Sequence, residues 1–377
     1  MPLAVGLPLL VASAWPVWGA FGRLTDLTGE WEAGGHDLLW GFQNLYNPCV
    51  VQVPDDEYPF RMWLFGWAAA DDNPGYAGAD AIFHARSRDL EHWEVYAGER
   101  GWDAGMRPDL WVPVLTADHE PYDNVHNGDP SVVFRDGTYL MAFSSVGFDT
   151  QADAEAKSHI YLVSCVMGAT SPDGIHWQKS PAPLLVWDRE YENRWELIPG
   201  QGVGSPPAEY YGSYHRPSLL FDEGRWRLWF DYFVPGTFVS MGYAENHGAF
   251  LDPGGWQVLR AGKRPLLRDW PNPSVVRLGD RYYAFSDAPG YPAEWGGDTR
   301  QITMAVSGDG LRWTVLGHLR PDPGAVGTHV PEAFVLAGEG GAWLYVFYAW
   351  KPDRQPWDFR YKSIRYARCW FAEGRSD

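Results

Sequence analysis

Five short stretches of similar pattern constrain the fold of this 377-residue chain more than any other feature. In each, a polar residue precedes a small residue or a proline, and a run of β-branched or apolar residues follows. The stretches span residues 44–51, 126–133, 213–220, 269–276 and 329–336, and we call their polar residues the anchors: Asn47, Asp129, Arg216, Asn272 and Glu332. Burying a polar group without a partner is costly. The anchors are therefore expected to face one another in a ring around a single pocket.

Each anchor stretch is followed by two further strand-like segments. The second segments are aromatic and cover residues 61–68, 139–145, 226–233, 282–287 and 343–350. The third segments cover residues 81–87, 160–171, 239–245, 301–307 and 359–367. A turn that ends in tryptophan, such as Ser-Pro-Asp-Gly-Ile-His-Trp at residues 171–177, then leads to a fourth strand, and we expect this motif to be structural.

Four strands repeated five times predict an all-β fold, a five-bladed β-propeller with four-stranded blades around a central axial pocket. We expect residues 1–377 to form one propeller domain. The last repeat has no clear fourth strand after Cys369, so a segment near the N-terminus is expected to supply that strand and close the ring.

Composition narrows the possible partners. The formal net charge of -18 disfavours nucleic acid and anionic membranes as partners, and no apolar stretch is long enough to span a bilayer. The three cysteines lie far apart and show no metal-binding spacing. No cofactor or metal is predicted, although a structural ion such as calcium in the axial channel is compatible with the pattern.

Residues 1–20 are apolar but lack a basic start, because Arg23 is the first cation. This favours a cytoplasmic protein, with a secreted one as the alternative if these residues are a signal peptide. Oligomeric state is left open.

Two anchors are carboxylates, and a pair of carboxylates is the minimal equipment for glycoside hydrolysis. Asp129 and Glu332 are the candidate acid/base pair, and Asp287 is a further catalytic candidate. The predicted substrate-binding residues are the polar groups Asn47, His126, His215, Arg216, Asp231, Asn272 and His329. Aromatic candidates for stacking on sugar rings are Trp67, Trp270, Trp295, Trp350 and Trp357.

The five repeats, with Asp129-Pro130-Ser131-Val132-Val133 and Pro331-Glu332-Ala333-Phe334, resemble the five-bladed propeller glycosidases. These are the arabinanases and β-xylosidases of glycoside hydrolase family 43 and the related invertases and levansucrases. The resemblance implies that Asp129 is the general base and Glu332 the general acid. The chain departs from that pattern at Asn47, where those families carry their first acid. Because Asp129 and Glu332 lie on non-adjacent blades, we expect a wide separation and inversion at the anomeric carbon.

Two other functions stay open at this stage. Tyr46-Asn47-Pro48 followed by Gly128-Asp129-Pro130 resembles the early blades of mannoside phosphorylases of glycoside hydrolase family 130. In that case a cluster of basic residues would hold phosphate, and Glu332 would have no catalytic task. The other alternative is a non-catalytic carbohydrate-binding propeller, which predicts stacking and hydrogen bonding without a carboxylate pair. The differing anchors favour one asymmetric site and therefore an enzyme.

Overall fold

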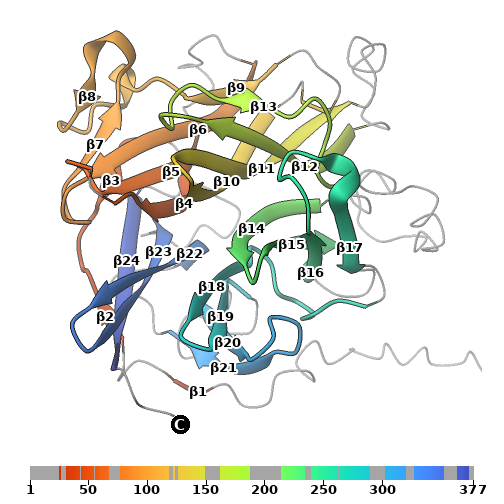
Figure 1. Cartoon of the computed structure of the whole chain (residues 1–377). Coiled ribbons are helices and arrows are strands. Elements are labelled where there is room, and N and C mark those ends of the chain that lie inside the picture. The colour runs from red at the N-terminus through yellow and green to blue at the C-terminus, as the bar shows by residue number, and fades with distance from the viewer. Residues whose placement is uncertain are drawn as a thin grey trace, which may run out of the picture.

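The computed structural model consists almost entirely of β-strands, arranged as five sheets around a common axis (Figure 1). It describes residues 25–26, 31–42, 44–54, 56–67, 77–118, 122–123, 126–148, 162–186, 214–233, 239–261, 264–288, 302–319, 327–351 and 363–372. The prediction of an all-β, five-bladed propeller is confirmed. The second and third strands begin and end within a few residues of the predicted segments.

The blades follow one another along the chain. Blade I contains β4 (Asn44–Gln52), β5 (Phe60–Trp67), β6 (Ala77–Ser87) and β7 (Trp93–Tyr96), extended by β8 (Trp102–Asp103) and β9 (Leu115–Ala117). Blade II contains β10 (His126–Arg135), β11 (Thr138–Phe148), β12 (Leu162–Ser171) and β13 (Gln178–Lys179). Blade III contains β14 (Tyr214–Asp222), β15 (Arg225–Phe233), β16 (Val239–Asn246) and β17 (Trp256–Arg260). Blade IV contains β18 (Ser274–Leu278), β19 (Arg281–Ser286), β20 (Thr303–Ser307) and β21 (Thr314–His318), with β1 (Thr25–Asp26) paired to β21. Blade V contains β22 (Gly327–Gly338), β23 (Gly341–Lys351) and β24 (Ser363–Ala372), with β2 (Glu32–Ala33) and β3 (Leu39–Trp40) paired to β24.

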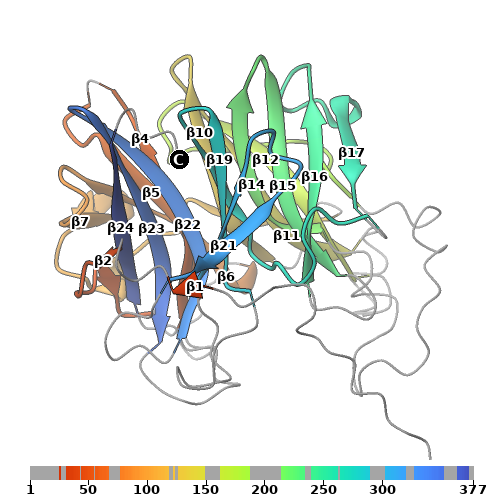
Figure 2. The ribbon, with the colours of Figure 1, turned by 90° about the horizontal axis from the view of Figure 1, so that it is seen from below.

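The first strand of every blade lies next to the axis. Contacts run from β4 to β10, β14, β18, β22 and back to β4, which makes a closed cycle. Figure 1 shows these first strands around the centre of the ring, and Figure 2 shows the blades from below, at a right angle to that view. The five anchor stretches therefore meet at one end of the axis, because each lies at the start of a first strand.

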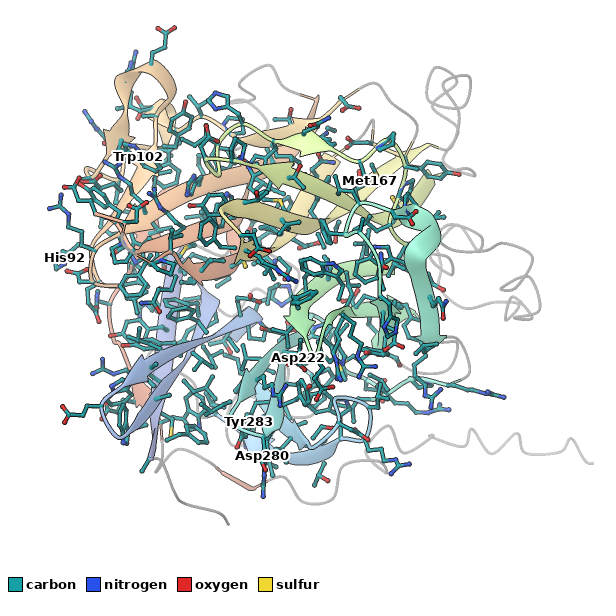
Figure 3. The ribbon with its side chains drawn as sticks, viewed as in Figure 1. His92, Trp102, Met167, Asp222, Asp280 and Tyr283 are labelled. Atoms are coloured by element: carbon teal, nitrogen blue, oxygen red, sulfur yellow. The ribbon has the colours of Figure 1, made fainter. Side chains whose placement is uncertain are left out.

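Aromatic side chains fill the spaces between neighbouring sheets (Figure 3). Blade III carries Trp229 on its second strand, and the fully buried indole packs with Tyr243 and with Tyr282 of blade IV. Alternate residues of each second strand point to opposite faces, so a strand covered on both sides is apolar along its whole length. This explains the aromatic second segments that mark the repeat in the sequence.

The tryptophan-ended turns bind one blade to the next. In blade II, Asp173 accepts hydrogen bonds from two backbone N–H groups of the turn, and Trp177 donates its indole N–H to the carbonyl of Gly174 at 3.1 Å. Trp63 of blade I donates to the same carbonyl at 3.0 Å. The equivalent bond joins Trp229 to Gly310 at 2.9 Å between blades III and IV. Both glycines have positive φ, which glycine alone adopts without strain. These contacts agree with a structural role for the motif.

Segments far apart in the sequence form the edge of blade V. β2 and β3 pair with β24, so the early part of the chain provides the strands that follow the third strand of this blade. Asp37 accepts hydrogen bonds from Ser363 at 2.7 Å and from Arg365 at 2.6 Å. Residues 1–20, which bear on the question of a signal peptide, lie outside the described residues. In the part of the chain that is described, no helix is long and apolar enough to cross a membrane.

Candidate active site

A backbone distortion places the anchors. The inner strands of blades I, II and III carry a bulge at the anchor, where Asn47, Asp129 and Arg216 have φ of 50°, 49° and 47°. Asn272, just before β18, has φ of 49°. A proline follows each of these residues, and a bulge suits proline because it has no N–H to leave unpaired. Positive φ costs a non-glycine residue about 1–3 kcal/mol and is concentrated at functional sites.

The prediction of Glu332 as the anchor of blade V is wrong. In blade V the bulge lies between His329 and Glu332, and the residue with positive φ is Val330, at 46°. Val330 precedes Pro331 and so takes the place that Asp129 has in blade II. Glu332 lies two residues further along the strand. The proline marks the bulge, whereas the sequence assignment relied on the polar side chain.

Glu332 instead belongs to a second ring, which we call the clamp ring: Cys49, Ser131, Ser218, Ser274 and Glu332. The first four members accept a hydrogen bond from a backbone N–H of the next blade. The donors are Val132, Leu219, Val275 and Ala333, at 3.1, 2.9, 2.8 and 2.8 Å. The clamp ring therefore ties the inner strands together in order.

The carboxyl group of Glu332 is hydrogen-bonded to the side chains of Ser274 and Cys49. Burial raises its pKa to about 8, and hydrogen bonds with Ser274 and Cys49 only partly oppose this. A small hydroxyl or thiol serves the clamp position in the other four blades, so a long acidic side chain is not required there for packing. Glu332 still keeps part of its surface accessible. Burial thus favours the protonated form of this carboxyl group.

A chain of charged and polar contacts, which we call the axial cluster, joins Asp129, Arg216, Asp231, Asn272, Asp287 and His329. Arg216 donates to Asp231 at 3.1 Å, and its Nε lies 3.9 Å from Oδ1 of Asp129. The backbone N–H of Asn272 donates to Asp231 at 3.0 Å. Asp231 is 1% exposed, whereas the Arg216 side chain is 27% exposed. Asp231 thus holds a guanidinium that can itself reach a ligand.

The second half of the axial cluster is centred on Asp287. This carboxylate is completely buried and is hydrogen-bonded to the amide of Asn272 and to Nδ1 of His329. The ring of His329 lies 6.3 Å from that of Tyr46, which directly precedes the anchor of blade I. Asp287 therefore orients the imidazole in the same way as Asp231 orients the guanidinium.

Burial and neighbouring charges shift the pKa values of the axial cluster in opposite directions. Burial raises the pKa of Asp129, while Arg216 and the hydroxyl of Ser144 stabilise its ionised form. Burial also raises the pKa of Asp231 against the same arginine. For Arg216, burial lowers the pKa, but Asp231 and Asp129 outweigh it and hold the pKa above its usual value. The arginine remains charged and shares its charge between two carboxylates.

Other predicted site residues lie around the cluster. Asn47 donates across the blade boundary to the carbonyl of Pro130 at 3.3 Å. His215 is half-buried and lies opposite Asp231 in the pairing of β14 with β15. Trp350 is covered on one face by the guanidinium of Arg365, 3.6 Å from the ring centre.

The prediction that Trp270 stacks on a sugar ring is wrong. Its indole is fully buried in a hydrophobic cluster with Trp229 and Met241, so neither face is accessible to a sugar. The side chains of His126 and Trp67, and all of Trp295 and Trp357, lie outside the described residues.

Sequence reasoning missed Ser144, whose hydroxyl accepts the backbone N–H of Arg216 at 2.8 Å and bonds to Asp129. Its only signal was a small polar residue in an aromatic strand. Within the described part of the chain, no group of three or more histidine, cysteine or acidic side chains is placed to hold a metal ion.

The arrangement resembles solved glycoside hydrolases in fold. A family 117 glycoside hydrolase of the marine bacterium Zobellia galactanivorans superposes with a TM-score of 0.57 at 12% identity, over 92% of each chain. A GH43_1 enzyme from Xanthomonas citri, solved with xylotriose, gives 0.54 at 14% identity, over 89% of this chain and 90% of that one. The Bombyx mori GH32 beta-fructofuranosidase gives 0.51 at 13% identity, over 89% of this chain and 61% of that one. No family model matches the sequence, and no curated protein is significantly similar to it. The chain thus shares the five-bladed fold of these enzymes.

Proposed function

We propose that this protein is a glycoside hydrolase that acts at the axial end of the inner strands, with Glu332 as general acid and Asp129 as general base. The observation that supports this most is that two buried carboxyl groups on the first strands have different neighbours. Burial raises the pKa of both, but Asp129 faces the cation Arg216, which opposes the rise, whereas Glu332 is hydrogen-bonded to Ser274 and Cys49 and its pKa reaches about 8. Two carboxyl groups whose surroundings separate their pKa values can serve as an acid and a base.

The chemistry follows from this difference. Glu332 donates its proton to the leaving glycosidic oxygen. Asp129 takes a proton from a water molecule, which attacks the anomeric carbon from the opposite face. The two residues belong to blades II and V, which are not neighbours in the ring. Such a placement favours the separation of roughly 6.5–9.5 Å that leaves room for water and inverts the anomeric configuration.

The remaining cluster residues have supporting tasks in this proposal. Arg216 and His329 bind sugar hydroxyls, and Asp231 and Asp287 fix their orientation. Both supporting carboxylates are almost fully buried, so they act through their partners and not on substrate directly. Fixed donors of this kind bind without reorganising during the reaction.

Hydrolysis is favoured over phosphorolysis by the charge of the cluster. Three carboxylates, Asp129, Asp231 and Asp287, accompany Arg216, whose charge two of them already share. An incoming phosphate dianion would have to compete with these carboxyl groups for Arg216 and His329. A neutral sugar and a water molecule carry no such penalty.

The test is a screen of aryl furanosides and pyranosides with the wild type, Asp129→Asn and Glu332→Gln, with and without phosphate. Matched controls are Asp136→Asn and Glu339→Gln, which make the same changes at exposed turns of the same two hairpins. We expect hydrolysis to fall by about 10²–10⁴-fold in the two site variants and to persist in the controls. The anomer first formed, read by NMR, reports inversion. Full activity in either site variant refutes its assigned role, and turnover only with phosphate replaces hydrolysis by phosphorolysis.

A further inference from the structure

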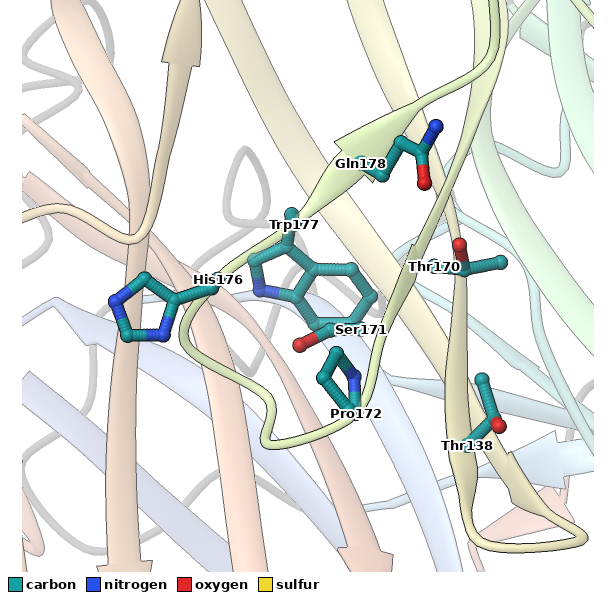
Figure 4. Close-up of a pocket in the computed structure, with 7 residues that line it drawn as sticks. All are labelled: Thr138, Thr170, Ser171, Pro172, His176, Trp177 and Gln178. Carbon is teal, nitrogen blue, oxygen red and sulfur yellow. The ribbon is translucent and has the colours of Figure 1, made fainter.

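A cavity lies on blade II, away from the axial cluster. It measures about 440 Å³ and is lined by Thr138, Thr170, Pro172, Trp177 and Gln178 together with Ser171 and His176. Figure 4 shows the indole of Trp177 between the turn that leads to β13 and the strand that carries Thr170. The volume falls in the range of roughly 300–1,000 Å³ found for small-molecule sites.

The cavity lies at the opposite end of the blade from the anchors. Thr138 begins β11 and pairs with Arg135 at the end of β10, whereas Asp129 lies near the start of β10. Arg135 lies six positions after Asp129 along the strand, a distance of about 20 Å at roughly 3.3 Å per residue. A ligand in this cavity therefore does not touch the axial cluster.

Blade I shows what closes this position elsewhere in the same protein. The pair Thr170 and Gln178 in the register of blade II corresponds to Arg86 and Glu94 in blade I. There the guanidinium and carboxylate form an ion pair at 2.9 Å, and the turn tryptophan Trp93 is only 3% exposed. Blade II has two shorter or uncharged side chains instead, and Trp177 is half-buried. The guanidinium of Arg86 also stacks on Tyr58 and Trp102, 3.8 and 4.1 Å from the ring centres. The ion pair is therefore part of what covers this position in blade I.

The exposed groups define the ligand class. The indole N–H of Trp177 is engaged by the Gly174 carbonyl at 3.1 Å, so the ring offers its flat surface. His176 is paired with Asp173 at 2.7 Å. The hydroxyl of Ser171 donates to Asp173 at 3.0 Å. The remaining polar side chains of the wall, those of Thr138, Thr170 and Gln178, are neutral. An aromatic surface beside neutral donors and acceptors suits a neutral polyhydroxylated ring.

We propose that this cavity is a second carbohydrate-binding site, which holds a neutral sugar unit of a glycan chain on the face opposite the axial cluster. The choice of a sugar agrees with the proposed glycosidase activity, but binding here requires no catalysis. If both sites serve one substrate, that substrate is a polymer and not a short glycoside, because about 20 Å of strand separates them.

The test variant copies blade I into blade II: Thr170→Arg together with Gln178→Glu. The matched control places the same pair in blade IV, as Val306→Arg with Thr314→Glu, at the register position where those two residues already pair. Binding is measured by affinity electrophoresis in soluble arabinan, xylan, mannan and β-glucan, and by titration with the matching hexasaccharides. We expect the wild type and the blade IV control to be retarded by at least one glycan. The blade II variant should bind that glycan about tenfold more weakly or worse, the loss of one or two good contacts.

Catalysis provides the second measurement. Turnover of short aryl glycosides should be equal in the blade II variant and the wild type, and Asp129→Asn should still be retarded in the gel. A wild type that none of these glycans retards refutes the proposal. So does retardation that the blade II variant keeps and Asp129→Asn loses, because the axial site would then account for all binding. An inactive wild type that is still retarded through blade II refutes the glycosidase proposal and leaves this one standing.

Discussion

Replacing Glu332 with glutamine removes the titratable carboxyl group from the last position of the clamp ring. Burial raises the pKa of this carboxyl from an ordinary value of 4.5 to about 8. Between these values the folded chain holds a proton that the unfolded chain has released. The free energy of unfolding should therefore fall by about 1.4 kcal/mol for each pH unit in this window. The contribution is fully present below pH 4.5 and is lost as pH rises to about 8.

Part of the Glu332 side chain remains accessible, and water there screens the penalty. We therefore expect the wild type to lose about 2–4 kcal/mol between pH 5 and pH 8 relative to Glu332→Gln, which has no proton to release. His84 has the opposite effect on the free energy of unfolding. Burial lowers the pKa of its imidazole, so its contribution to stability grows as pH rises toward 6.5. Both proteins contain His84, so its effect cancels in the difference.

The assay is urea denaturation of the wild type, Glu332→Gln and Glu339→Gln at several pH values from 5 to 8. Glu339 lies on the exposed turn between β22 and β23, and its replacement should leave the wild-type slope intact. The difference in unfolding free energy between the wild type and Glu332→Gln should grow steadily with pH. Parallel curves for these two proteins would show that Glu332 is ionised in the folded state, which would refute its assignment as a proton donor.

Three further substitutions test the clamp ring, a hydrogen bond between two blades and the charges of the axial cluster. Ser218→Ala leaves the buried N–H of Val275 without its acceptor at 2.8 Å and should cost about 1–3 kcal/mol in urea denaturation; no change would show that the clamp contact contributes nothing. Trp229→Phe removes the indole bond between blades III and IV and should lower the midpoint of thermal unfolding by a few degrees, a loss of about 1 kcal/mol or more. Asp231→Asn removes a negative charge that helps to raise the pKa of Asp129, so the acidic limb of the kcat/KM profile should move to lower pH; a shift upward would contradict the proposed charge balance.

The repeat could be predicted from sequence because each blade obeys the same local physics. At the start of each first strand, a residue with positive φ is followed by proline, and an aromatic second strand is buried on both faces. Both features leave a pattern that one chain repeats five times. The turn at residues 171–177 is equally local, since Asp173 and Gly174 complete it with backbone contacts.

The site itself was less predictable because its contacts join different blades. Glu332 was predicted as an anchor because its side chain is polar. The strand register instead places Val330 at the anchor position of blade V. A hydrophobic valine at a strained position gives no signal of a bulge except the proline after it. Trp270 illustrates the same limit, because an aromatic residue beside an anchor reads equally as a stacking platform or as core, and burial decides for core.

The seam between the two ends of the ring has a consequence for synthesis on the ribosome. Asp37 and Ser363 are joined by a hydrogen bond although 326 positions separate them, and β2 and β3 find their partner only in β24. The axial cluster draws on blades II to V, and Glu332 meets Cys49 of blade I across the same boundary. Domains that depend on contacts of such long range assemble late and slowly. A nascent chain therefore has no complete fragment of this site, and the proposed acid and base come together only when the last strand has left the ribosome.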